Sequence, residues 1–205
     1  MENSENEIRK CCVGQNMSQK LKILAIHGYR QNAETFHAKT GSFRKMVHKW
    51  AQFTYITAPH KVILVDDSND LNKGDEPNIG QSKDEEQYGW FFNRDDKTFR
   101  GIRKGGPAIG FEHSLKLVET VFEEDGPFDG ILGFSQGACF VGLLCDLQQR
   151  GSLSNCFEEP VVVKHPGGHY LPASSAQKHE YQKFFKLQQL QKQYGEQSVE
   201  KIGDI

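Results

Sequence analysis

The sequence lacks any long hydrophobic run. No segment of the 205 residues approaches the roughly 20 apolar residues that a transmembrane helix needs. The first 20 residues contain no apolar core of the kind found in secretory signals, and Glu2 stands where myristoylation requires glycine. We therefore expect a soluble protein without a membrane span, located in the cytoplasm, with the nucleus as an alternative.

The sequence also has no large excess of positive or negative charge, and its cysteines form no CxxC pair. The net charge is -2 and no long basic run occurs, so nothing favours nucleic acid or an anionic membrane surface as a partner. No CxxC pair is present, and this argues against zinc and redox chemistry. We expect no metal and no organic cofactor. The cysteines number five: Cys11, Cys12, Cys139, Cys145 and Cys156.

Hydrophobic residues make up only 37% of the chain, and the polar ends account for much of the deficit. Between the ends, short apolar runs typical of buried strands alternate with segments of helical spacing. This alternation predicts an α/β fold with a mostly parallel sheet and helices on both faces. The predicted strands are 21–26, 53–58, 129–133 and 161–163, and the predicted helices include 108–124, 136–150 and 174–194. We expect a disordered tail over 1–20, one domain over 21–190 and a polar tail over 191–205.

The strongest chemical signal is Gly133-Phe134-Ser135-Gln136-Gly137, which matches the G-x-S-x-G nucleophile elbow. A predicted strand precedes it and a predicted helix follows it, as the motif requires. Glycine on both sides allows the sharp turn that exposes the serine above the carboxyl end of the sheet. We therefore predict Ser135 to be a catalytic nucleophile; the alternative is a chance match in a turn.

Two backbone amides are candidates for an oxyanion hole beside this serine. The N–H of Gln136 follows the nucleophile directly, at the start of a helix where negative charge is favoured. The second N–H is expected from the loop after the first strand, most simply from Tyr29. His27, at the end of that strand, is interpreted as a packed structural histidine.

A general base for Ser135 is expected after it in the chain, on a loop beyond the last strand. His169 and His165 both lie there, in the segment Lys164-His165-Pro166-Gly167-Gly168-His169. The glycines beside His169 suit a loop that reaches over the sheet, so we favour His169. The remaining alternative is that both are surface histidines.

The long segment 66–106 is acidic and rich in glycine and asparagine, yet it contains the aromatic sequence Tyr88-Gly89-Trp90-Phe91-Phe92. A solvated loop would not need such a cluster. Tyr88, Trp90 and Phe91 are therefore candidates for binding the acyl part of a substrate. Plain packing of these rings onto the domain is an equal alternative.

Several segments in the same order resemble the family of serine hydrolases, a group of α/β-hydrolases with animal and fungal members. They are LKILAIHGYRQN, ITAPH, YGWFF, GPFDGILGFSQGA and PVVVKHPGGHYLP, and they span about 20–185. The resemblance implies an intracellular carboxylesterase acting on small-molecule esters, with a preference for long-chain alkyl esters in animal members. It carries Ser135 over as nucleophile and His169 as base, and it sets the aromatic segment beside the acyl site.

The chain departs from this family in the third member of the triad. The resemblance implies an acidic residue after a further strand, between the nucleophile helix and the histidine loop. Ser135 and His169 are only 34 positions apart, and the predicted helix fills half of that interval. Two strands, a helix and the acid turn are therefore expected to be missing. The acids left nearby are Glu158, Glu159 and Asp146, none of them well placed in sequence.

These observations predict a serine carboxylesterase of reduced competence. A thioesterase is an alternative, because it needs the same nucleophile, base and oxyanion hole. A non-catalytic acyl-binding or interaction module, left by loss of the acid, is the alternative from another class.

Overall fold

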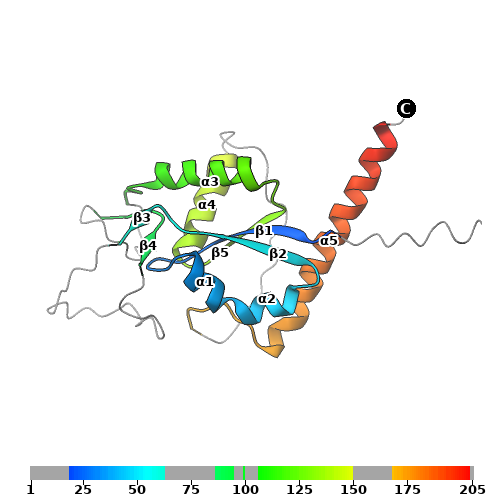
Figure 1. Ribbon diagram of the computed structural model, residues 1–205, viewed down its shortest axis with the longest axis horizontal. Coiled ribbons are helices and arrows are strands. Elements are labelled where there is room, and N and C mark those ends of the chain that lie inside the picture. Colours follow the sequence, from blue (N-terminus) through cyan, green and yellow to red (C-terminus); the bar gives the residue numbers. More distant parts are fainter. Residues whose placement is uncertain (1–18, 63–85, 95–98, 100–105, 150–167, 204–205) are drawn as a thin grey trace, which may run out of the picture.

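The computed structural model describes residues 19–62, 86–94, 99, 106–149 and 168–203. Ten elements lie in these ranges (Figure 1). They are β1 (Leu21–Ile26), α1 (Ala33–Lys39), α2 (Gly41–Val47), β2 (Ala51–Ile56), β3 (His60–Lys61), β4 (Tyr88–Gly89), α3 (Phe111–Asp125), β5 (Gly130–Gly133), α4 (Gln136–Gln149) and α5 (Ser175–Gly203).

The main sheet of the described residues is parallel and has the order β2-β1-β5. Ile26 is in register with Ile56 on one side and with Gly133 on the other, so the three strands end at the same edge. Helices α3 and α4 lie over one face, whereas α1, α2 and the first part of α5 lie over the other (Figure 1). The predicted α/β fold, with a parallel sheet covered on both faces, is confirmed.

β1 forms the centre of the core because both of its faces are buried. Leu24 and Ile26 point into the layer formed with α3 and α4, where Phe140 is fully buried. Leu21 and Ile23 point to the opposite layer, formed with α2 and α5. Alternation along a strand produces this division, and a strand with both faces covered reads as a continuous apolar run.

Some boundaries differ from those expected. β2 begins at Ala51, two residues before the predicted start, and α5 continues to Gly203. The predicted polar tail 191–205 is therefore helical over 191–203. The predicted strand 161–163 and most of the predicted tail 1–20 lie outside the described residues. Among the described helices, none has both the length and the apolar content needed to cross a membrane.

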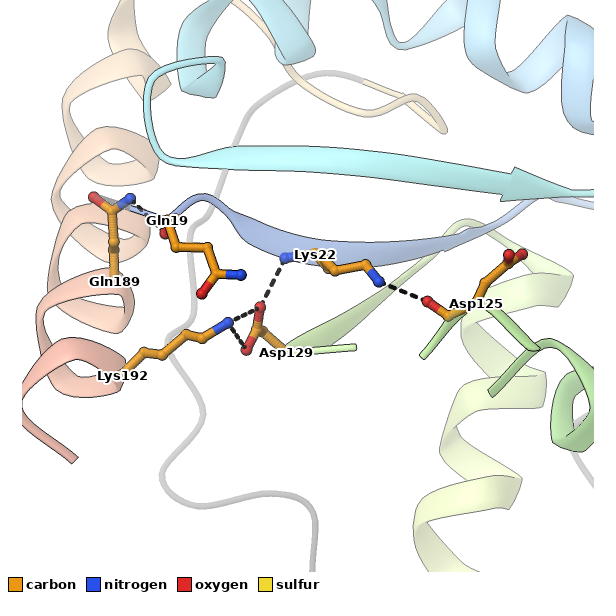
Figure 2. A network of polar contacts seen from close by, with 6 residues as sticks. All are labelled: Gln19, Lys22, Asp125, Asp129, Gln189 and Lys192. Atoms are coloured by element: carbon orange, nitrogen blue, oxygen red, sulfur yellow. Dashed lines mark hydrogen bonds and ion pairs between the residues drawn. The ribbon is translucent and has the colours of Figure 1, made fainter. Parts of the chain in front are cut away.

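A polar network fastens α5 to the amino-terminal end of the sheet (Figure 2). Nζ of Lys192 lies 2.9 Å and 3.0 Å from the two carboxylate oxygens of Asp129. Asp129 also accepts a 2.8 Å hydrogen bond from the backbone N–H of Lys22, and the Gln189 side chain donates to the carbonyl of Gln19. The side chains of Lys192 and Asp129 are only 22% and 21% exposed, so solvent screens this pair less than a surface pair.

We predict that Asp129→Ala lowers the free energy of unfolding by about 1–3 kcal/mol, because the backbone N–H of Lys22 loses its charged acceptor. Lys192→Met should cost less than about 1 kcal/mol, since it removes only a partly screened pair. Urea unfolding of both variants measures the difference. Asp129→Asn is the matched control, because it keeps an acceptor oxygen. If Asp129→Asn and Asp129→Ala lower the free energy of unfolding equally, the hydrogen bond from the N–H of Lys22 is not what stabilises the contact between α5 and the sheet.

Candidate active site

The chain turns sharply between β5 and α4, and Ser135 stands at the turn. Its φ of 52° places a non-glycine residue in the left-handed region, a conformation that costs energy and is concentrated at functional sites. The turn is held by two backbone hydrogen bonds. The N–H of Phe134 donates to Ile26 at 3.0 Å, and the N–H of Gly137 donates to Phe134 at 2.8 Å. The predicted strand–serine–helix arrangement is present.

The glycines of the elbow are required by close backbone contacts. A Cβ on Gly137 would lie 2.5 Å from the carbonyl oxygens of both Ile26 and His27. A Cβ on Gly133 would lie 2.8 Å from the Cα of Ala138. Real Cβ atoms do not approach other atoms so closely. The motif therefore contains glycine because the first turn of α4 lies directly against the end of β1.

The loop after β1 lies against Ser135. A Cβ on Gly28 would lie 3.1 Å from the Cβ of Ser135, and Tyr29 follows in the chain. The loop is fixed by Arg30, whose φ is 60° and whose N–H donates to the carbonyl of Tyr88 at 2.9 Å. On the other side of the serine, the backbone N–H of Gln136 makes no hydrogen bond to any described residue. The two segments predicted to form an oxyanion hole therefore flank Ser135.

The side chain of Gln136 has a role that sequence reasoning missed. It is 1% exposed, and its Oε1 accepts a 2.8 Å hydrogen bond from the N–H of Trp90. Its Nε2 donates to the carbonyl of Phe91 at 2.6 Å. One amide thus satisfies two backbone groups of the aromatic segment and ties that segment to the elbow. No local sequence pattern predicts these hydrogen bonds, because the bonded residues are more than 40 positions away.

His27 is buried and serves the structure. Its Nε2 accepts a 2.9 Å hydrogen bond from the N–H of Ala58, so Nδ1 carries the proton and donates to the carbonyl of Gly28 at 2.7 Å. Burial lowers the pKa of His27 to about 4, although the Gly28 carbonyl opposes the shift. The ring is therefore neutral near pH 7, and the interpretation of His27 as a structural histidine agrees with its surroundings.

The aromatic segment does not present its three candidate residues to one surface. Trp90 is 0% exposed, stacks on Phe140 with ring centroids 5.2 Å apart, and donates from Nε1 to the carbonyl of His27 at 2.8 Å. Trp90 therefore follows the packing alternative. The hydroxyl of Tyr88 donates to an exposed carboxylate, and Phe91 is buried against the ring of Phe99.

His169 is exposed and lies beside the elbow. Its ring stacks on that of Phe134, with centroids 5.0 Å apart and an interplanar angle of 28°. Within the described part of the chain, no hydrogen bond joins His169 to Ser135 or to a carboxylate. Asp146 lies on an exposed side of α4, and His165, Glu158 and Glu159 lie outside the described residues. The structure thus places the predicted base, His169, beside Phe134, the residue that precedes the predicted nucleophile.

The described residues contain no group of three histidine, cysteine, aspartate or glutamate side chains placed to hold a metal ion. The chemistry available at the elbow is that of a hydroxyl, an imidazole and backbone amides. With the parallel sheet and the left-handed serine, these features define an α/β-hydrolase of the serine type.

The chain belongs to the serine hydrolase (FSH1) family, whose model matches residues 17–155. It is 39% identical to an esterase of Anopheles gambiae over 221 positions, covering 83% of this chain and 79% of the relative. An esterase of Aedes aegypti is 41% identical over 82% of this chain and 76% of its own length. The OVCA2 esterase of Danio rerio is 32% identical over 81% of this chain and 96% of its own.

We predict that His27 makes folding stability fall as the pH drops below about 6.5. The unfolded chain takes up a proton near pH 6.5, whereas the folded chain resists protonation until about pH 4. The stability lost between these values is about 3 kcal/mol, with a maximum slope of about 1.4 kcal/mol per pH unit. Urea unfolding from pH 7 to 4 measures it. His27→Gln should show a shallower dependence, and an equal slope in both proteins would contradict this account.

Proposed function

We propose that this chain hydrolyses carboxylic esters through an acyl-enzyme formed on Ser135. The observation that carries the proposal is the left-handed conformation of Ser135 between β5 and α4. In the first step, Oγ attacks the ester carbonyl and the hydroxyl proton passes to His169, which then delivers it to the leaving alcohol. In the second, His169 takes a proton from water, the hydroxide attacks the acyl group, and Ser135 leaves with the proton restored.

The negative oxygen formed in each step would be held by the backbone N–H groups of Gln136 and Tyr29. Two observations support this assignment. The backbone N–H of Gln136 has no acceptor among the described residues, and it lies at the start of a 14-residue helix, where partial positive charge accumulates. Gly28 brings the loop that carries Tyr29 to within contact of Ser135.

The role of His169 requires a rearrangement of its ring. A general base must come within about 3 Å of the proton that it removes, and such contacts are often looser before substrate binds. The stacking on Phe134 holds the imidazole one residue from the nucleophile, while its exposure leaves the ring room to turn. This supports His169 as the base in preference to a residue farther from the elbow.

The proposed substrates are esters with an apolar, long-chain acyl or alkyl part. Aromatic rings surround the loop that flanks Ser135: Tyr29 lies 5.6 Å from Phe99, and Phe99 lies 5.4 Å from Phe91. Of the aromatics singled out in the sequence, we retain Phe91 and Tyr88 as contacts, with Trp90 supporting them from the core. Thioesters would be cleaved by the same groups.

We further propose that a segment carrying the triad acid is missing between α4 and His169. The alignment with the Anopheles esterase runs over 221 positions, although 83% of this 205-residue chain is only about 170 residues. About 50 aligned positions of the relative therefore face no residue of this chain. The family model also stops at residue 155, before the histidine loop.

The exposed surface of β5 and α4 also supports the proposal that a segment of the family fold is missing. In the described residues, β5 pairs on one side only, and each of its four residues is partly exposed. On α4, Leu143 is 38% exposed, and a Cβ on Gly142 would meet no atom within 4 Å. Additional strands beside β5 would cover these groups. A chain without the acid also fits the alternative of a module that binds acyl groups but does not hydrolyse esters.

We predict that a fluorophosphonate probe labels this protein and that Ser135→Ala abolishes the labelling. The probe reports an activated serine regardless of which ester is the natural substrate. Ser114→Ala, at another buried serine, is the control for unrelated loss of signal, provided that circular dichroism shows it folded. Labelling that persists in Ser135→Ala would exclude Ser135 as the nucleophile, and a wild-type protein that is never labelled would favour the module.

We also predict that inserting the segment found in the relatives raises ester hydrolysis by about 10⁴-fold, the loss that follows when the acid of a serine protease triad becomes its amide. The acid orients the imidazole and stabilises its protonated form. Short- and long-chain p-nitrophenyl esters, with thermal unfolding in parallel, compare the two forms. Matched turnover in both would mean that another acid serves His169 and that the missing segment is dispensable.

A further inference from the structure

An open groove of about 520 Å³ runs between α2 and the first turns of α5, on the face of the sheet opposite α3 and α4. Lys45, His48 and Lys49 line it from α2 and the turn after it, and Lys178 lines it from α5. A second hollow of about 370 Å³ shares Lys45 and His48 and adds Arg44. The two hollows therefore form one continuous surface, which we call the basic groove.

No described residue neutralises the positive charge of the lysines in the basic groove. In the part of the chain that the structure describes, the side chains of Lys45, Lys49 and Lys178 make no ion pair or hydrogen bond. The sequence contains no aspartate or glutamate between Glu34 and Asp66. Unpaired lysines from two elements, within a protein of net charge -2, concentrate a positive field at this one face.

The arrangement of charged residues along α5 also favours positive charge on the side of the basic groove. Lys186 follows Lys178 by eight positions, which places it about 80° around the helix, on the side that carries Gln182. Glu180 is the one acidic residue of α5 before position 196, and two positions from Lys178 place it about 200° around the helix. The acidic residue is thus turned away from the basic groove.

Apolar side chains lie among these lysines. Met46 and Trp50 both line the groove and are half-buried, so each leaves part of its surface to solvent. Lysines beside a partly exposed tryptophan are typical of surfaces that rest on the headgroup region of a bilayer. A small hollow with an apolar side suits a lipid headgroup and its glycerol better than the long, uniformly polar backbone of a nucleic acid.

We propose that the basic groove docks this protein on membranes that expose anionic phospholipid. Lys45, Lys49 and Lys178 would contact the headgroup phosphates and carboxylates, and Trp50 would enter the interface. Each lysine near such a surface strengthens binding by about fivefold. The groove lies across the sheet from α4 and does not include Ser135, so docking is independent of ester hydrolysis.

The test is binding to vesicles of phosphatidylcholine with about 30% phosphatidylserine, compared with phosphatidylcholine alone. We expect binding to the mixed vesicles only, and loss of most of it in about 0.5 M NaCl, where charges are screened beyond a few ångströms. The double variant Lys45→Gln/Lys178→Gln should bind about 25-fold more weakly. Lys61→Gln/Lys116→Gln removes the same charge elsewhere and should bind as the unaltered protein does.

Tryptophan fluorescence provides an independent readout, because the chain has only Trp50 and Trp90 and Trp90 is fully buried. Brominated lipid should quench the emission, and Trp50→Phe should remove the quenched component. Equal weakening by the two lysine pairs, equal binding to both kinds of vesicle, or binding abolished by inorganic phosphate at constant ionic strength would overturn the proposal. The last result would show a site for a free anion instead of a membrane surface.

Discussion

The close contact between the first turn of α4 and the end of β1 is the constraint on which the site depends. Gly137 lies against the carbonyl groups of Ile26 and His27, where no larger residue fits. This contact fixes the angle at which the chain leaves β5, and the angle in turn forces Ser135 into its left-handed conformation. The strain is local, and β5 on one side and α4 on the other hold it in place.

A buried polar network extends this constraint to the rest of the site. Gln136 bonds the backbone of the aromatic segment, Trp90 bonds the carbonyl of His27, and His27 bonds the N–H of Ala58. Each donor is matched by an acceptor, so little desolvation cost remains uncompensated. The network joins the ends of β1, β2 and β5 at the edge of the sheet where Ser135 lies.

The histidine side of the site is less firmly held. His169 has an aromatic neighbour, Phe134, but no hydrogen-bonded acid within the described residues. Its loop leads into α5, which is fixed by Phe185 in the core and by the pair of Lys192 with Asp129. The proposed nucleophile and oxyanion groups are therefore held by many contacts, whereas the proposed base, His169, is positioned among the described residues by ring packing on Phe134. Poor turnover with intact nucleophile labelling is the behaviour that this combination favours.

Much of the fold followed from local patterns. The strand 21–26 and the elbow around Ser135 are recognisable because apolar runs and glycine spacing are fixed by neighbouring residues. The limits of β2 were misplaced because pairing with β1, and not local preference, sets where that strand begins and ends. The far end of α5 was also misplaced, since the helix continues to Gly203. The sequence also did not distinguish acyl binding from plain packing for the aromatic segment.

By itself, the sequence determined the class of chemistry, because a nucleophile elbow needs particular residues at particular spacings. Only the tertiary structure decided that Trp90 is a core residue, that the Gln136 side chain ties distant segments together, and that lysines from α2 and α5 share one surface. These facts rest on contacts between residues 40 to more than 130 positions apart. Such contacts depend on how buried faces meet in three dimensions, and no local pattern of charge or hydrophobicity records them.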